Sequence, residues 1–214
     1  MPALTGPLFS LTARKSLKKT LTYSRWRGVQ YVRSHVVPSN PDTTAQQEVR
    51  QTFRNLNLIW NYMPTIAREP WTARASGQPF TDRNEFFKQN LPVLYSETDL
   101  VNFVGSPGAG GAPPPASINA VAGNDIITVD VVAPSLPTGW TIAAAQVMGV
   151  ANFDPQSQQS GALVAAGQDA TSTYQVILTG LTPVLHEVRA WLKWTKPDGT
   201  FAYSVALSDS ATPT

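Results

Sequence analysis

The side chains that most often perform chemistry in proteins are scarce in this sequence. It contains no cysteine and two histidines, His35 and His186, which lie about 150 positions apart. No flanking pattern marks a serine nucleophile, and no histidine lies in a cluster of carboxylates with metal-ligand spacing. The sequence therefore predicts no catalytic, cofactor-binding or metal-binding residue, and we expect a protein that is not an enzyme.

A glycine-rich run from Gly105 to Gly111 could be mistaken for a phosphate-binding loop. It lacks the Gly-Lys-Ser/Thr ending of such loops, and it is neither preceded by a hydrophobic strand nor followed by a helix. Three prolines follow it at positions 113–115. Glycines make a chain flexible and consecutive prolines stiffen it. We interpret residues 105–115 as a linker between two domains.

Basic and aromatic residues occur together near the N-terminus. The first 35 residues contain seven Lys and Arg and no acid. Three partners are open: nucleic acid, a membrane surface, or a neighbouring subunit that is joined by strand addition. The strand character of residues 29–37 favours the neighbouring subunit, and we expect no membrane contact. The predicted interface residues are Arg25, Trp26, Arg27, Tyr31 and Arg33.

Residues 1–40 are interpreted as an extended basic arm. Leu21 and Tyr23 alternate with threonine and serine, and Val29 and Tyr31 flank a glutamine. This alternation predicts an extended arm or a pair of strands that bends near Arg27-Gly28. A short helix around residues 15–21 is an alternative.

The next part, residues 41–104, is predicted to be a helical module. Thr43 or Thr44 can cap a helix over residues 43–62, and Pro64 ends it. A second helix is predicted over residues 81–90 with Thr81 as its cap. The segment around Trp71 is a short helix or a loop. The first helix has one apolar stripe, formed by Ala45, Val49, Phe53, Leu56, Trp60 and Met63.

The last part, residues 116–214, contains several short runs of strand-forming residues. The runs begin near Ile126, Trp140, Tyr174 and Val188, and a turn at residues 196–199 leads to a partner strand over residues 201–207. Several short strands in about 100 residues predict a β-sandwich. The predicted fold class is therefore α+β, with an extended arm and a helical module before an immunoglobulin-like or fibronectin type III-like β-sandwich.

Aromatic residues of the last part could line a carbohydrate site, although most residues of this kind lie in the core of a sandwich. Trp191 and Trp194 have opposite parity along one predicted strand. In the absence of a bulge, one of them should therefore face outward. We expect the outward one to be an exposed aromatic contact for an assembly or a ligand.

The C-terminal part resembles a fibronectin type III domain over residues 114–211. The resemblance rests on the proline-rich entry, on Leu181-Thr182-Pro183, and on the hairpin turn at Pro197-Asp198-Gly199. In that family a tyrosine follows the leucine-x-proline pattern and makes a corner hydrogen bond. Glu187 occupies the matching position here, which implies that the corner is absent or replaced.

Residues 24–91 are similar to a module of bacteriophage virion proteins and related prophage proteins. The matching features are two short motifs at Trp26-Arg27-Gly28 and Tyr31-Val32-Arg33, a helix that bears Gln, Arg and Phe, and a Thr-x-x-Asn-x-Phe step at residues 81–86. The resemblance implies a non-enzymatic structural component of a tailed-phage particle, located in the virion. Decoration or cement of the capsid, the connector and the tail are the open positions within the particle.

The resemblance implies other virion proteins and copies of the same chain as partners, and no cofactor. Opposite charge supports contacts between copies, because residues 1–105 hold 13 Lys and Arg against 7 acids, and residues 106–214 hold 3 against 7. Two other functions stay open. The sandwich could be a cell-surface or glycan-binding module, or the arm could bind nucleic acid.

Overall fold

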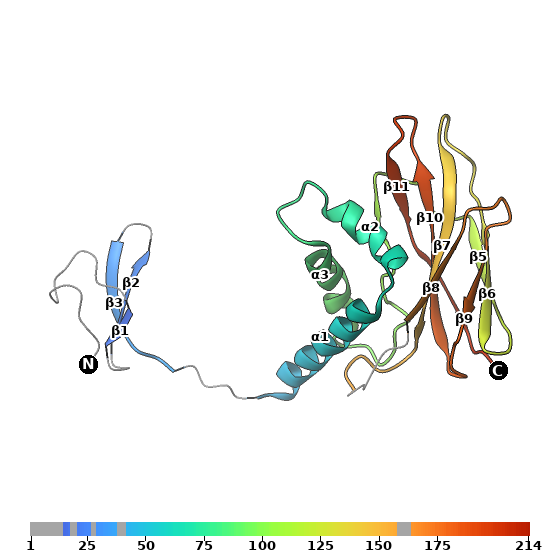
Figure 1. Ribbon diagram of the computed structural model, residues 1–214. Coiled ribbons are helices and arrows are strands. Elements are labelled where there is room, and N and C mark those ends of the chain that lie inside the picture. The colour runs from blue at the N-terminus through green and yellow to red at the C-terminus, as the bar shows by residue number, and fades with distance from the viewer. Residues whose placement is uncertain (1–14, 18–20, 27–28, 38–41, 158–163) are drawn as a thin grey trace. The chain divides into compact units, whose positions relative to one another are not determined.

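The computed structural model of the protein describes residues 15–17, 21–26, 29–37, 42–157 and 164–214 (Figure 1). The chain forms two compact units, one that ends at Asp42 and one that begins at Thr43. We call them the N-terminal unit and the body. No helix in the described ranges is both long enough and apolar enough to cross a membrane.

The N-terminal unit is a three-stranded antiparallel sheet in the order β1-β2-β3. Its strands are β1 (Lys15–Leu17), β2 (Leu21–Trp26) and β3 (Val29–Ser34). Trp26 pairs with Val29, which confirms the predicted strand pair, whereas the bend predicted near Arg27-Gly28 lies outside the described residues. The alternative of a helix around residues 15–21 is wrong, because residues 15–17 instead pair as a strand with β2.

The body begins with three helices, α1 (Thr44–Tyr62), α2 (Thr65–Ala75) and α3 (Asp82–Leu94). The predicted caps are confirmed, since Thr43 Oγ1 accepts from the Gln46 amide and Thr81 Oγ1 accepts from the Asn84 amide. These bonds satisfy amides that have no partner within the first helical turn. The open choice at residues 65–75 resolves as a helix.

Only the second half of the apolar stripe of α1 enters the core. Leu56, Trp60 and Met63 are buried, whereas Val49 and Phe53 stay partly exposed. Phe53 still contacts Phe87 of α3, with ring centroids 4.5 Å apart. The stripe therefore identifies the side of α1 that packs on the core, and its first half lies at the edge of the packed region.

Two antiparallel sheets follow the helices, and together they form the β-sandwich. The small sheet has the order β5-β6-β9, from β5 (Ser117–Ala122), β6 (Ile126–Val132) and β9 (Gln175–Thr179). The large sheet has the order β4-β11-β10-β7-β8, and β12 also pairs with β10. Its strands are β4 (Pro107–Ala109), β7 (Thr141–Ala151), β8 (Val164–Asp169), β10 (His186–Thr195), β11 (Phe201–Val205) and β12 (Leu207–Ala211).

The large sheet is the middle layer of the body. One of its faces packs on the small sheet around an apolar core that includes Val129, Leu178 and Trp194. The opposite face packs on the three helices around a second core, which includes Trp71 and Trp191. Figure 1 shows the helices on the side of the large sheet that faces away from β5 and β6.

The Gly/Pro segment at residues 105–115, interpreted from the sequence as a linker, instead belongs to the large sheet. Ala109 of β4 pairs with Tyr203 of β11, and Ser106 Oγ donates to the Ser204 carbonyl over 2.7 Å. Gly108 has a φ of 69° and lies against Val205, where a Cβ atom would come within 2.9 Å. Glycine here allows a left-handed turn and a close approach rather than flexibility. Helices and sandwich accordingly form one compact unit.

Candidate docking site

The structure places four of the five predicted interface residues on two paired strands. Arg25 and Trp26 lie in β2, and Tyr31 and Arg33 lie in β3. Arg27 lies outside the described residues. Tyr31 and Arg33 share one face of β3 because side chains alternate along a strand. Both of their side chains are exposed.

The opposite face of β3 and the residues that follow it also expose apolar side chains. Val32, Val36 and Val37 are 53%, 68% and 74% exposed. β3 is an edge strand, so one of its sides has no strand partner among the described residues. An isolated sheet of this size needs packing on one face to be stable. Uncovered apolar side chains on a small sheet with a free edge indicate a surface that packs against something else.

The N-terminal unit and the body carry opposite charge. Residues 1–42 contain seven Lys and Arg and one acid, a net charge of +6. Residues 43–214 contain nine Lys and Arg and thirteen acids, a net charge of −4. The unit with the uncovered strand is therefore also the unit that an acidic surface would attract.

The predicted exposed aromatic contact is wrong for both candidates. Trp191 and Trp194 do lie on opposite faces of β10, as their parity indicates, but both are fully buried. The helices cover the face that would otherwise be exposed. Trp191 Nε1 donates to Gln146 Oε1 over 2.8 Å, and Trp194 Nε1 donates to the Pro113 carbonyl over 3.1 Å. The pairing register shifts next to Trp194, because Lys193 pairs with Ala144 and Trp194 pairs with Ile142. The extra residue lies in β7, so the side chains of β10 continue to alternate between the two faces.

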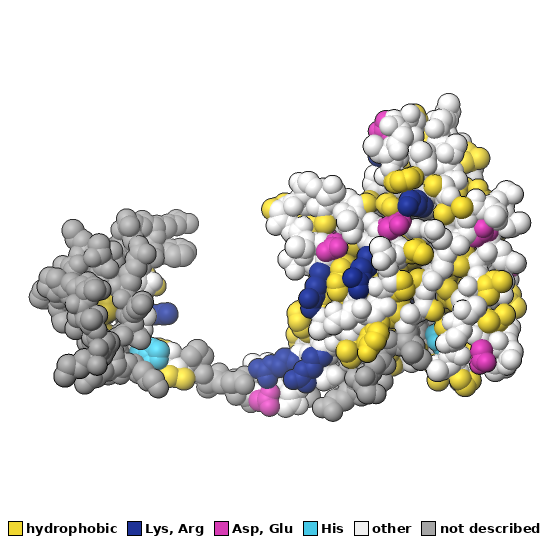
Figure 2. All heavy atoms as spheres, in the orientation of Figure 1, with side chains coloured by type: hydrophobic (Ala, Val, Ile, Leu, Met, Phe, Trp, Pro, Cys, Tyr) yellow, Lys and Arg dark blue, Asp and Glu magenta, His cyan; other side chains and the backbone are white. Residues whose placement is uncertain are grey.

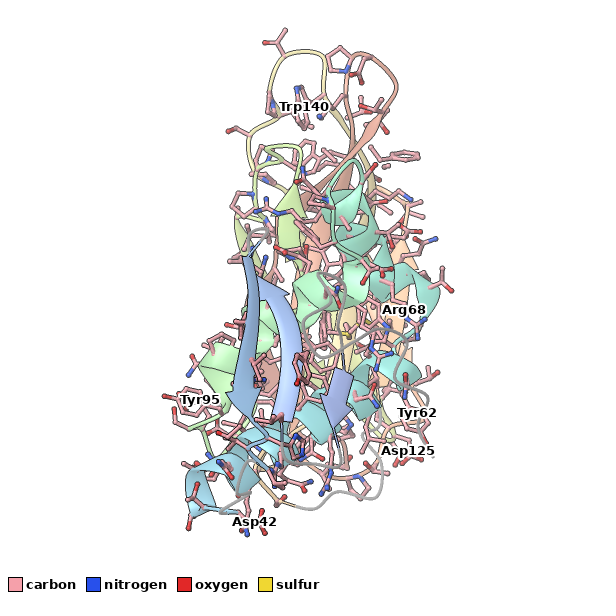
Figure 3. The ribbon with its side chains drawn as sticks, turned by 90° about the vertical axis from the view of Figure 1, so that its left-hand side faces the viewer. Asp42, Tyr62, Arg68, Tyr95, Asp125 and Trp140 are labelled. Atoms are coloured by element: carbon pink, nitrogen blue, oxygen red, sulfur yellow. The ribbon has the colours of Figure 1, made fainter. Side chains whose placement is uncertain are left out.

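Other aromatic side chains reach the surface of the sandwich, among them Phe201 and Trp140. Phe201 is exposed, and the centroid of its ring lies 4.4 Å from Lys193 Nζ. Trp140 is half-buried at one end of the sandwich (Figure 3), where its ring meets that of Trp194. Neither is one of the two residues, Trp191 and Trp194, that were predicted as the exposed aromatic contact.

Sequence reasoning missed a polar cluster that joins α2 to the large sheet. Glu69 Oε2 accepts from Lys193 Nζ and Gln146 Nε2, each over 2.9 Å, and from Tyr203 Oη over 3.1 Å. Burial acts to raise the pKa of Glu69, but these donors outweigh it, and the pKa is lowered. Burial and the neighbouring carboxylate raise the pKa of Tyr203. The cluster links two layers of the body through one shared carboxylate.

A second polar cluster holds the segment between α3 and β4 against the large sheet. Arg189 Nε donates to the Phe103 carbonyl over 2.7 Å, and Nη2 donates to the carbonyls of Leu100 and Val101 over 3.0 and 2.6 Å. Glu187 lies 3.4 Å from Nη1. Burial lowers the pKa of Arg189 and raises that of Glu187, and their mutual attraction opposes both shifts. Glu187 thus pairs with the arginine that fixes this segment.

The two histidines lie in different units. His35 follows β3, and its Nδ1 is 3.4 Å from Thr22 Oγ1 of β2. His186 begins β10, and its Nδ1 is 2.7 Å from the Val184 carbonyl. Among the residues described, no three His, Asp or Glu side chains gather in a way that could hold a metal ion.

Comparisons with known proteins add no function to this geometry. No family model and no curated protein matches the chain. One solved structure, titled "Myokine structure", is similar with 13% sequence identity and a TM-score of 0.34, over 49% of this chain and 100% of that one.

Proposed function

We propose that this protein is a non-enzymatic structural component of a tailed-phage particle that docks through its N-terminal unit. The observation that carries the docking is the basic three-stranded sheet, whose apolar side chains are uncovered and whose edge strand is β3. The phage assignment rests on the resemblance of residues 24–91 to a virion module. Capsid decoration, the connector and the tail are the positions that this assignment allows.

The docking uses the chemistry of an exposed strand. The backbone of β3 can extend a partner's sheet, while Val32 on one face and Tyr31 on the other provide side-chain contacts. Several basic residues strengthen the encounter with an acidic partner. Each contact alone is weak, but many copies on a symmetric particle act together and the total attachment becomes firm.

The body is the part that projects from or bridges the particle in this proposal. We assign its sandwich to the fibronectin type III-like class, and the arrangement of its strands supports that assignment. A three-stranded sheet faces a larger antiparallel sheet, and β11 and β12 follow each other along one side of β10. Sandwiches of this class often act as spacers or binding modules, so the fold alone does not select a role.

The test is incorporation of the chain into particles. Phage particles are purified by density gradient from the cell that encodes the sequence, and the chain is measured by quantitative mass spectrometry. We expect the wild-type chain at a fixed number of copies per particle. The Val32→Asp variant places a charge at an exposed apolar position of β3, and we expect the variant chain to be absent from particles.

A matched control separates docking from general damage. Val184→Asp makes the same change at an exposed valine of the body and should leave the copy number unchanged. Absence of the wild-type chain from particles would exclude the phage role. Equal incorporation of both variants would exclude docking through β3. Binding of the free chain to DNA that weakens steeply with salt would support the nucleic-acid alternative instead.

A further inference from the structure

The outer face of the small sheet is an uncovered surface with apolar side chains. Cross-strand neighbours Val121, Thr128 and Ile177 form one row across β5, β6 and β9, and Val132 ends β6 on the same face. Val121, Val132 and Ile177 are each about half exposed. The inner face of these strands already packs on the large sheet, so the outer face is free to receive a partner.

The charge on this face is negative. No Lys or Arg occurs between residues 89 and 188, a range that includes all three strands. Asp130 lies at the centre of the outer face, in the row next to Ile177, where it accepts from Gln175 Nε2 over 2.7 Å. Asp125 lies in the turn between β5 and β6. Six of the nine Lys and Arg of the body lie instead between residues 43 and 95, in the helical segment (Figure 2).

We propose that the outer face of the small sheet binds the N-terminal unit of a second copy of this chain. The N-terminal unit has the complementary properties: a net charge of +6, exposed Tyr31 and Arg33 on one face of β3, and exposed Val36 and Val37 just after the strand. An apolar surface that carries one sign of charge favours a partner whose apolar surface carries the other. The inference rests on the proposed function only in taking the N-terminal unit as the docking element.

The geometry of such a contact has a consequence for assembly. The donor surface and the acceptor surface are different parts of the chain, so the contact is heterologous. Each copy then has one free donor and one free acceptor, and association continues until a ring closes or a filament grows. The smallest closed product is a ring of two copies, in which each N-terminal unit binds the small sheet of the other copy.

A charge swap in the full-length chain tests the contact. Self-association is measured by sedimentation velocity over a series of concentrations, at low and at high salt. We expect association in the wild type that weakens as salt screens the charges. Asp130→Lys and Arg33→Glu should each weaken association by about tenfold, because each puts like charges together. The double variant, in which the two charges have changed places, should recover most of the loss.

The control and the outcomes separate this inference from the proposed function. Glu48→Lys makes the same change as Asp130→Lys on α1, and it should associate like the wild type. A wild-type chain that stays monomeric at every concentration overturns the inference, whereas its incorporation into particles can still stand. If Arg33→Glu weakens association and Asp130→Lys does not, the N-terminal unit binds another surface, and the small sheet is the wrong acceptor.

Discussion

The large sheet buries both of its faces, and the two faces differ in chemistry. Toward the small sheet, β10 presents only apolar side chains from Val188 to Trp194. Toward the helices, the same strand presents Glu187, Arg189 and Trp191, all buried. A sheet face can thus be covered without being apolar, provided that the covering layer supplies partners for each polar group. Hydrophobic burial stabilises the first face, whereas the second also depends on specific hydrogen bonds.

Arg189→Ala is the strongest test of this difference. The substitution removes the donor to three carbonyls of residues 100–103 and leaves Glu187 buried without its partner. We expect the free energy of unfolding to fall by about 3–5 kcal/mol, as for other buried ion pairs that lose one member. Urea denaturation measures the change. Arg54→Ala, at an exposed position of α1, is the control and should change stability by about 0.5 kcal/mol or less.

A double variant shows how much of that loss of stability comes from leaving the Glu187 carboxylate buried without its partner. Arg189→Met combined with Glu187→Leu removes both charges and keeps similar volumes. We expect it to be more stable than Arg189→Ala but less stable than the wild type, because the three carbonyls still lack a donor. If Arg189→Ala alone costs less than about 1 kcal/mol, the arginine does not anchor the segment, and the comparison between the faces fails.

Glycines on the two faces provide a smaller test. A Cβ at Gly105 would lie 2.6 Å from Arg189 Cβ, which is close to the backbone and cannot move aside. We expect Gly105→Ala to cost about 1–3 kcal/mol, as overpacking does elsewhere. A Cβ at Gly149, on the apolar face, would meet the terminal methyl of Leu178 at 2.9 Å. That side chain can rotate, so Gly149→Ala should cost less. If both substitutions lower the urea concentration at the unfolding midpoint equally, both faces accommodate an added methyl group to the same degree.

The elements of the body that have strong local signals could be predicted from the sequence. Thr43 and Thr81 are helix caps with side-chain hydrogen bonds, and the alternation along β10 correctly assigned Trp191 and Trp194 to opposite faces. Strands made of small residues cannot be predicted from such local patterns. β8 has the sequence VAAGQD and was not predicted, because it lacks a run of branched or aromatic residues.

The burial of the polar face of β10 under the helices could not be predicted, because the groups that bind Arg189 are backbone carbonyls. Glu187, Arg189 and Lys193 alternate with apolar residues, a pattern typical of a strand with one side in water. What covers Arg189 is a set of backbone carbonyls nearly 90 residues earlier in the chain. Backbone groups are the same in every sequence, so neither spacing nor composition reveals such a contact. The glycine-rich segment at 105–111 was misread for a related reason, since its glycines permit close packing rather than motion.

The smallest expected effect concerns the pH dependence of stability at the first residue of β10. His186 precedes Glu187 and lies on the face of Val188, where it is fully buried. Burial lowers its pKa below the ordinary value of 6.5, and the hydrogen bond to the Val184 carbonyl only partly opposes this. The unfolded chain therefore binds more protons than the folded chain at pH values between the folded pKa and 6.5. Stability from this group is present above pH 6.5 and is lost as the pH falls through that window.

His186→Asn keeps a donor for the Val184 carbonyl and removes the titration. We expect the free energy of unfolding of the wild type to fall more steeply than that of the variant between about pH 7 and about pH 5, by at most about 1.4 kcal/mol per pH unit. Urea denaturation at several pH values measures both slopes. Glu187, whose pKa is raised, contributes with the opposite sign, but it is present in both chains and cancels in the difference. Equal slopes would mean that the imidazole is protonated as readily in the folded chain as in the unfolded one, and that this end of the apolar face is open to water.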